Sequence, residues 1–290
     1  MPPKRRWRRI FLLAIGTFGA YLLLCYTLAL GIVGHKNAEQ GINLPRLRSA
    51  PVTVGQYRVP LILTEGLHRF DGRDDRPIFV LVHGYGGSPR TFGRLIEEVH
   101  SRDGLVAVPW MRGHGENPTP TVGFGVPESE EVVAVVRYVR AHRPRSKIVV
   151  AGVSLGGAAV LLAGPRIREE IEGIAVEASF PTLPEAIDVW TDAGLGRMKG
   201  LFAPVLWMAE RMVGENPSSV RPEDAARTLR GLPGVIIRCG EDELMPSRFS
   251  DRLSTASGWP IFEVPQARHA AASRQDPKGY ADQLYGLIRP

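Results

Sequence analysis

The chain has 290 residues, 44% of them hydrophobic and 23% charged, a composition that fits a large globular core and excludes disordered and collagen-like classes. Its net charge of +6 is compatible at first sight with nucleic-acid binding. Five of these charges lie together near the N-terminus, and the rest of the chain is close to neutral. The basic residues concerned are Lys4, Arg5, Arg6, Arg8 and Arg9. We therefore expect no nucleic-acid partner, because no basic face is left on the folded body.

The segment Ile10–Gly34 contains 25 residues without a charged side chain. As a helix it would be roughly 37 Å long, enough to cross a hydrocarbon core of about 30 Å. The preceding basic cluster predicts a cytoplasmic N-terminus and an extracytoplasmic body, periplasmic in a bacterium. Two alternatives are a cleaved signal peptide, for which Thr27-Leu28-Ala29 offers small residues, and a twin-arginine export signal at Arg8-Arg9.

We predict three parts: residues 1–34 as basic N-terminus and transmembrane anchor, 35–57 as linker or lead-in, and 58–290 as the main folded domain. One or two edge strands are expected within 52–63. Further along, apolar runs and helical periods alternate. The expected strands cover residues 78–82, 105–108, 148–151, 173–178, 235–239 and 260–264, and the helices 89–100, 128–141, 155–164, 247–257 and 277–288. This order predicts an α/β fold with a mainly parallel sheet and helices on both faces.

Residues 180–229 interrupt this alternation with short helical patterns broken by Gly and Pro. The segment is rich in large apolar side chains, and two interpretations are open. It forms a small helical cap over the site, or its apolar residues pack an accessory helix pair onto the body. Those side chains are Trp190, Met198, Phe202, Trp207, Met208 and Met212.

Ser154 lies in Gly152-Val153-Ser154-Leu155-Gly156, between an apolar run and a run of small and aliphatic residues. This pattern predicts a strand, a sharp turn and a helix, with the serine at the bend. The flanking glycines fit that turn, because it strains its central residue and leaves no room for neighbouring side chains. The serine hydroxyl is thus a candidate nucleophile.

An acid and a base follow on later strands, in an order that suits a serine nucleophile. Asp242 comes just after the strand 235–239, and His269 just after the strand 260–264. The carboxyl ends of parallel strands share one sheet edge, so both should lie near Ser154. Glu241 and Glu243 flank Asp242, and a shift of one residue in the turn would give either of them the orienting role.

Oxyanion donors are expected from His83-Gly84-Tyr85-Gly86-Gly87, which follows the strand 78–82. We assign them to the backbone amides of Tyr85 and Leu155, the latter at the start of a helix whose dipole favours negative charge. A phosphate cradle is the rival interpretation, but the loop lacks the spacing of the known phosphate-binding motifs. We interpret His83 and His114 as residues that brace the loops.

Together these motifs resemble the serine hydrolases of the α/β-hydrolase superfamily over about residues 58–288. Arg112-Gly113-His114-Gly115 is similar to a loop of lipase-like and esterase-like members, although Trp110 stands where many of them carry aspartate. The segment 177–183 resembles membrane-anchored and prolyl-oligopeptidase-like members. The resemblance implies an α/β-hydrolase fold with a catalytic triad of Ser154, Asp242 and His269.

The expected activity is hydrolysis of a carboxylic ester, with a small-molecule or lipid acyl substrate, through an acyl-enzyme intermediate. A serine peptidase or thioesterase would use the same residues. An acyltransferase and a non-catalytic membrane-anchored binding module also remain open. No cofactor or metal is expected, because no histidine and carboxylate cluster has ligand spacing. The two cysteines, Cys25 and Cys239, imply no disulfide framework, and the oligomeric state is left open.

Overall fold

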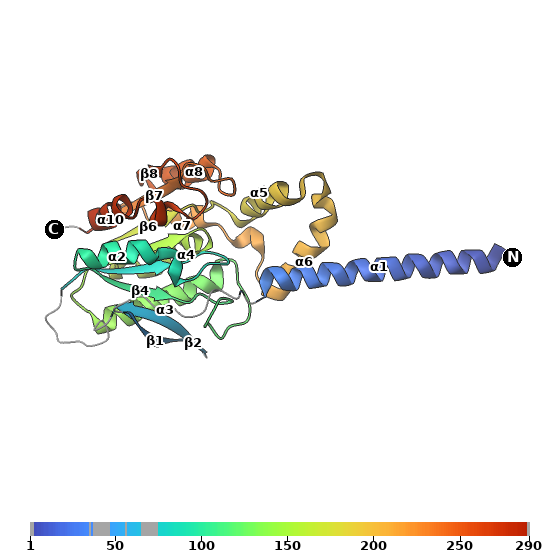
Figure 1. Cartoon of the computed structure of the whole chain (residues 1–290), viewed down its shortest axis with the longest axis horizontal. Coiled ribbons are helices and arrows are strands. Elements are labelled where there is room, and N and C mark those ends of the chain that lie inside the picture. Colours follow the sequence, from blue (N-terminus) through green and yellow to red (C-terminus); the bar gives the residue numbers. More distant parts are fainter. Residues whose placement is uncertain (1–2, 35, 37–46, 56, 65–74, 289–290) are drawn as a thin grey trace.

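The computed structural model describes residues 3–34, 36, 47–55, 57–64 and 75–288 (Figure 1). Its strands are β1 (Leu47–Val54), β2 (Tyr57–Thr64), β3 (Ile78–Val82), β4 (Leu105–Pro109), β5 (Ile148–Val153), β6 (Gly173–Glu177), β7 (Gly234–Cys239) and β8 (Ile261–Val264). Its α-helices are α1 (Pro3–Val33), α2 (Gly93–Ser101), α3 (Val126–His142), α4 (Leu155–Ile167), α5 (Leu183–Leu195), α6 (Ala203–Val213), α7 (Pro222–Thr228), α8 (Ser247–Ser257), α9 (Ala272–Gln275) and α10 (Pro277–Gly286). Short 3-10 turns are η1 (Pro89–Phe92), η2 (Arg168–Glu170), η3 (Gly196–Phe202) and η4 (Pro217–Ser219).

The strands form one sheet in the order β1-β2-β4-β3-β5-β6-β7-β8. The pairs β1–β2 and β2–β4 are antiparallel, and all pairs from β4–β3 to β7–β8 are parallel. Every residue of β3, β4, β5 and β6 is buried, as expected for strands covered on both faces. The parallel strands therefore bring the loops that follow β3, β5, β6, β7 and β8 to one edge of the sheet.

Two apolar cores lie on the two faces of this sheet. One contains side chains of α3, α4, α7 and α8, and the other contains side chains of α2, α9 and α10. Helices on both faces of a mainly parallel sheet are the architecture that the alternating sequence pattern predicts. A third, smaller cluster joins the start of α4 to α5 and to Phe249 of α8, so α5 is attached to the body beside the serine turn.

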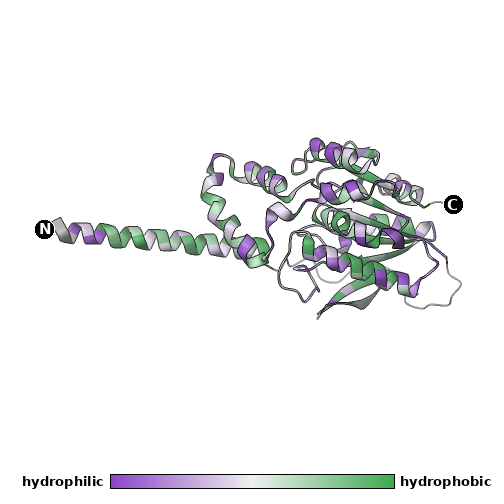
Figure 2. Cartoon of the chain, turned by 180° about the vertical axis from the view of Figure 1, so that it is seen from behind, coloured by the Kyte–Doolittle hydropathy of each residue, from purple (hydrophilic) through white to green (hydrophobic). Residues whose placement is uncertain are grey.

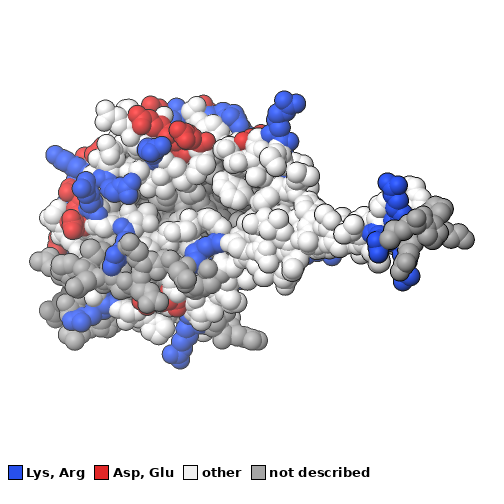
Figure 3. Space-filling view, turned by 45° about the vertical axis from the view of Figure 1, so that its right-hand side comes forward, with Lys and Arg blue, Asp and Glu red and all other residues white. Residues whose placement is uncertain are grey.

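Helix α1 projects from the body as a long, apolar rod (Figures 1 and 2). Its stretch Arg6–Val33, 28 residues, has the length and composition to cross a membrane. Lys and Arg side chains gather at its far end (Figure 3), where Arg6, Arg8 and Arg9 are exposed. The C-terminal end of α1 is fixed to the body, because the carbonyl oxygen of Val33 accepts a 2.9 Å hydrogen bond from the amide of Val122.

The helices between β6 and β7 lie in two different places. Helices α5 and α6 with η3, residues 183–213, project from the body on the side where α1 leaves it (Figure 1), and we call them the insert. Helix α7 instead packs in the main core, with Ala226 among the side chains of α3 and α4. The segment with the character of an insertion is thus shorter than the 180–229 expected from composition.

The predicted strands and helices of the body all occur, with bounds that differ by a few residues. The main difference is at the N-terminal side of the sheet. Residues 47–51 were expected in a linker, but they belong to β1, whose eight residues all pair with β2. Pro51 and Pro60 are tolerated there because they lie opposite each other near the sheet edge. Most of the lead-in before residue 47 lies outside the described residues.

Candidate active site

The turn between β5 and α4 holds Ser154 in a strained conformation. Its φ is 55° and its ψ is −118°, a region that non-glycine residues rarely occupy. A side chain at Gly156 would collide with the carbonyl oxygens of Val82 and His83, which explains the glycine two residues after the serine. The serine-bearing turn therefore packs directly against the end of β3. This is the strain and close approach that the sequence pattern predicts.

The three polar side chains assigned from the sequence lie together at the carboxyl edge of the sheet. Nε2 of His269 is 3.0 Å from Oγ of Ser154. Nδ1 of the same ring is 2.9 Å from Oδ2 and 3.1 Å from Oδ1 of Asp242. A neutral imidazole in this position donates from Nδ1 to the carboxylate and presents the lone pair of Nε2 to the hydroxyl. The arrangement can thus accept a proton from the serine.

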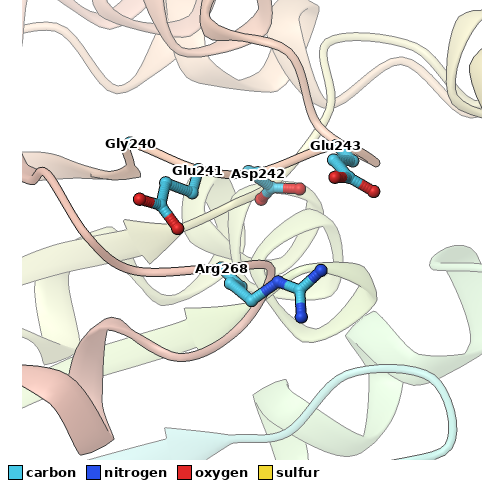
Figure 4. A pocket seen from close by; sticks show the side chains of 5 residues that line it. All are labelled: Gly240, Glu241, Asp242, Glu243 and Arg268. Carbon is cyan, nitrogen blue, oxygen red and sulfur yellow. The ribbon is translucent and has the colours of Figure 1, made fainter.

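Asp242 is held in place by the turn after β7. Its Oδ1 accepts hydrogen bonds from the amides of Leu244 at 2.9 Å and Met245 at 2.8 Å, and its side chain is 2% exposed. The two flanking acids, Glu241 and Glu243, are exposed and point to opposite sides of the turn (Figure 4). They line a depression next to Arg268 and do not contact His269 through any hydrogen bond among the described residues. The geometry favours Asp242 over both neighbours.

The loop after β3 lies against the serine turn. A Cβ on Gly84 would lie 2.9 Å from the carbonyl oxygen of Val153 and 3.1 Å from Cβ of Ser154. Neither the amide of Tyr85 nor that of Leu155 donates a hydrogen bond to another described residue. Both amides belong to loops in contact with Ser154, so they remain available as donors to a bound oxygen atom.

Two histidines brace this loop. The amide of Met111 donates to Nε2 of His83, which therefore carries its proton on Nδ1 and donates to the carbonyl of Gly84. The amide of Gly86 donates to Nε2 of His114 at 2.9 Å. Burial, and then the neighbouring His114, lower the pKa of His83 to about 3, so this ring is neutral at physiological pH. Both rings make the bracing contacts expected from the sequence.

Trp110 is a packing residue. It is fully buried, and its ring lies edge-on to His83 with the two centroids 6.2 Å apart. A side chain at Gly115 would collide with the same ring, so the loop after β4 closes over the indole. The tryptophan therefore helps to fix the histidine that braces the loop after β3.

A buried acid beneath the site was not singled out from the sequence. Glu177 ends β6 and is fully buried, and its Oε1 accepts a 2.8 Å hydrogen bond from the amide of Ala272, three residues after His269. Burial raises the pKa of Glu177 to about 7 and the pKa of the neighbouring Cys239 thiol to about 12. A charged residue at the end of the apolar run Gly173–Glu177 is the signal that could have revealed it.

The variant Glu177→Gln should change how stability depends on pH. Between about pH 4.5 and 7 the folded chain keeps a proton on Glu177 that the unfolded chain has released, so this group lowers stability as pH rises through that window. The glutamine oxygen can replace Oε1 opposite Ala272, and the side chain stays neutral. We expect the variant to gain up to about 3 kcal/mol over the parent at pH 8 and little at pH 4.5.

Thermal unfolding in detergent at the two pH values measures this difference. Glu169→Gln is the matched control, since the side chain of Glu169 is 94% exposed. If the variant gains the same stability over the parent at both pH values, the pKa of Glu177 is not raised by folding, and the expectation is wrong.

The sequence profile of the Alpha/beta hydrolase family matches residues 79–283, more than half of the chain and the whole region that carries the site. The chain belongs to the alpha/beta hydrolase family. The resemblance and the fold class predicted from the sequence are confirmed, and the protein is an enzyme of the alpha/beta-hydrolase type. No curated protein matches the sequence.

Several solved structures are similar to this alpha/beta hydrolase in fold. An esterase from Pyrococcus furiosus is 16% identical, with a TM-score of 0.68 over 88% of this chain and 97% of the esterase. A 2-hydroxy-6-oxo-6-phenylhexa-2,4-dienoate hydrolase from Rhodococcus is 17% identical, with a TM-score of 0.60 over 84% of this chain and 99% of that one. A bacterial membrane phospholipase A is 16% identical, with a TM-score of 0.59 over 98% of both chains.

Proposed function

We propose that this alpha/beta hydrolase cleaves carboxylic esters with Ser154 as nucleophile, His269 as base and Asp242 as the group that orients the base. The observation that carries the proposal is the continuous chain of contacts from Asp242 to Nδ1 and from Nε2 to the serine hydroxyl, at 2.9 and 3.0 Å. A nucleophile, a base and an orienting acid within hydrogen-bond reach form the arrangement that acyl transfer requires.

In the first half-reaction His269 accepts the hydroxyl proton of Ser154 at Nε2 while Oγ forms a bond to the ester carbonyl carbon. The carbonyl oxygen becomes an oxyanion, for which the amides of Tyr85 and Leu155 are the proposed donors. When the carbonyl reforms, the bond to the alcohol oxygen breaks and His269 gives its proton to that alcohol. The acyl group then remains on Ser154.

In the second half-reaction a water molecule attacks the acyl carbon and His269 accepts the water proton. Collapse of the second oxyanion releases the carboxylic acid and returns the proton from Nε2 to Ser154. Asp242 keeps its negative charge throughout and stabilises the imidazolium that forms in each half. The enzyme is regenerated without a cofactor.

We infer that α1 is a membrane anchor with its basic end in the cytoplasm and the body outside, because the basic residues precede the apolar span. The candidate site then lies close to a lipid surface, since the hydroxyl of Tyr85 donates a 2.9 Å hydrogen bond to the carbonyl of Ile32 at the end of α1. This proximity favours lipid-like acyl esters as the substrate class. One solved structure of similar fold is a membrane phospholipase A, which supports this choice of substrate class.

A substrate panel tests the proposed activity. p-Nitrophenyl esters of increasing chain length are compared with the matched anilides and acyl thioesters, with the Ser154→Ala variant as the blank. We expect the esters to be hydrolysed fastest, with kcat/KM rising as the acyl chain lengthens. Faster cleavage of the anilides or thioesters would assign a peptidase or a thioesterase. Ester consumption that depends on an added alcohol would assign an acyltransferase.

A further inference from the structure

The C-terminal part of helix α1, from Tyr21 to Val33, packs against the insert. The seam between α1 and α6 is apolar and buried. Farther along α1, the hydroxyl of Tyr21 donates a 2.7 Å hydrogen bond to the carbonyl of Leu201, at the end of η3. The insert therefore reaches back along α1, away from the body. The residues of the seam are Cys25, Ala29 and Val33 on α1 and Val205 and Ala209 on α6.

The position of this seam can be compared with the thickness of a bilayer. Starting from Ile10, the first residue after the basic cluster, a hydrocarbon core of about 30 Å is crossed by about 20 residues and ends near Ala29. Tyr21 is eight residues before Ala29, so it would lie about 12 Å below the outer boundary of the hydrocarbon. The insert, which contacts Tyr21, must then enter the outer leaflet with it.

Other placements of α1 do not lift the insert out of the membrane. A tilted helix needs more residues to cross the same core, which moves the outer boundary toward Gly34 and leaves Tyr21 inside. Sliding α1 outward until Tyr21 reached the boundary would draw Arg6, Arg8 and Arg9 into the hydrocarbon, where charged side chains are costly. The basic cluster thus fixes the depth of the insert as well as the orientation of the helix.

The surface of the insert suits this environment. Outside α1, five large hydrophobic side chains in the described part of the chain are exposed, and four of them belong to the insert. In Figure 3 the surface from α1 onto the adjoining part of the protein is largely uncharged. These four side chains are Trp190, Met198, Leu201 and Trp207, which are between 44% and 63% exposed. Exposed apolar groups at this density mark an interaction surface, and tryptophan is enriched at the membrane interface.

Several charged groups of the insert have a partner within it. The ammonium of Lys199 is 2.8 Å from Asp192 and 3.5 Å from Asp188, so its charge is paired within the insert. The guanidinium of Arg211 lies over the ring of Trp207, 5.2 Å from its centroid. Long basic side chains of this kind extend toward the headgroups while their stems stay in apolar surroundings.

We propose that the insert is a membrane-embedded element that lies in the outer leaflet beside α1, with Met198, Leu201 and Trp207 in contact with lipid. This inference rests on the proposed anchor. It adds that the body is held against the bilayer by two contacts, the helix and the insert. The insert is joined to the start of α4 through the cluster that contains Leu155 and Leu183, so the element in contact with lipid also packs against the helix that follows Ser154.

Depth-dependent fluorescence quenching of the full-length chain tests the proposal. Single cysteines replace Leu201, Met198, Phe18 or Ser101 in a background where Cys25 and Cys239 are alanine, and each is labelled with a nitrobenzoxadiazole dye. The proteins are reconstituted in phosphatidylcholine vesicles that contain lipid with a nitroxide at a shallow or a deep acyl position. Variants are compared only when their thermal midpoint equals that of the background.

Phe18 lies mid-span on α1 and is 62% exposed, whereas Ser101 is on the body at the end of α2. We expect the deep nitroxide to quench the labels at Phe18 and Leu201 most, because Leu201 contacts Tyr21 about 12 Å below the outer boundary of the hydrocarbon. At least one of the two nitroxides should quench the label at Met198 at least twofold, and neither should quench the label at Ser101. Labels at Leu201 and Met198 that behave like Ser101, while Phe18 is quenched, would overturn the embedded insert and leave the anchor standing. An unquenched label at Phe18 would overturn the anchor itself.

Discussion

Replacing Ser154 with alanine should lower kcat/KM for the best ester substrate by ~10⁵- to 10⁶-fold. The hydroxyl is the atom that would form the acyl bond, and no other described hydroxyl lies within hydrogen-bond distance of Nε2 of His269. The fold should be kept, because alanine adds no atoms at a position where φ is already 55°. The measurement is steady-state hydrolysis of p-nitrophenyl esters by the purified full-length protein in detergent.

Ser101→Ala provides the matched control for this result. Ser101 is exposed at the end of α2, and its hydroxyl donates a hydrogen bond to the carbonyl of Glu98 in the same helix. Its replacement should leave ester hydrolysis within about twofold of the parent, as expected for a surface substitution. Equal activity in the Ser154→Ala variant and the parent would assign the reaction to another residue.

The variant Asp242→Asn should lose about 10⁴-fold in kcat with little loss of stability. The Oδ1 atom of Asp242 accepts two backbone amides, those of Leu244 and Met245, and an asparagine would keep its carbonyl oxygen there. The amide nitrogen would then take the place of Oδ2, 2.9 Å from Nδ1 of His269. Because that nitrogen is a donor, the ring would hold its proton on Nε2 and could not accept one from Ser154.

Glu241→Gln and Glu243→Gln are the controls that separate the three acids of this turn. Both side chains are exposed, and we expect each variant to keep kcat within about threefold of the parent. Stopped-time ester assays across pH 5 to 9 measure all three variants. A loss in Glu241→Gln or Glu243→Gln as large as that in Asp242→Asn would move the orienting role to that glutamate.

The sequence was sufficient for features that depend on local pattern and strand order. The glycines around Ser154 predicted a tight turn, and the structure shows its positive φ and the close approach of β3. The positions of Asp242 and His269 after successive strands predicted that they share one edge with the serine, and parallel pairing from β5 to β8 places them there. Their catalytic roles stay predictions until the variants are measured.

Features that depend on contacts between distant segments could not be predicted. Glu177 accepts a hydrogen bond from the backbone amide of Ala272, 95 positions away. The hydroxyl of Tyr21 donates a hydrogen bond to the carbonyl of Leu201, 180 positions away. Neither pair has a periodicity or a spacing that marks it, because the contact exists only once the sheet has formed. The same holds for α7: it lies within the segment 180–229 that the sequence sets apart as an insertion, but its packing partners are in the main core.

Mapping the site of a fluorophosphonate adduct tests the proposed catalytic role of Ser154 most directly. The full-length protein is treated with the probe, digested and analysed by mass spectrometry, in parallel with His269→Ala. We predict one stoichiometric adduct, on the peptide that contains Ser154, and a large loss of labelling rate in His269→Ala because the serine then lacks its base. An adduct confined to another residue, or labelling of Ser154 at the same rate without His269, would contradict the proposed mechanism.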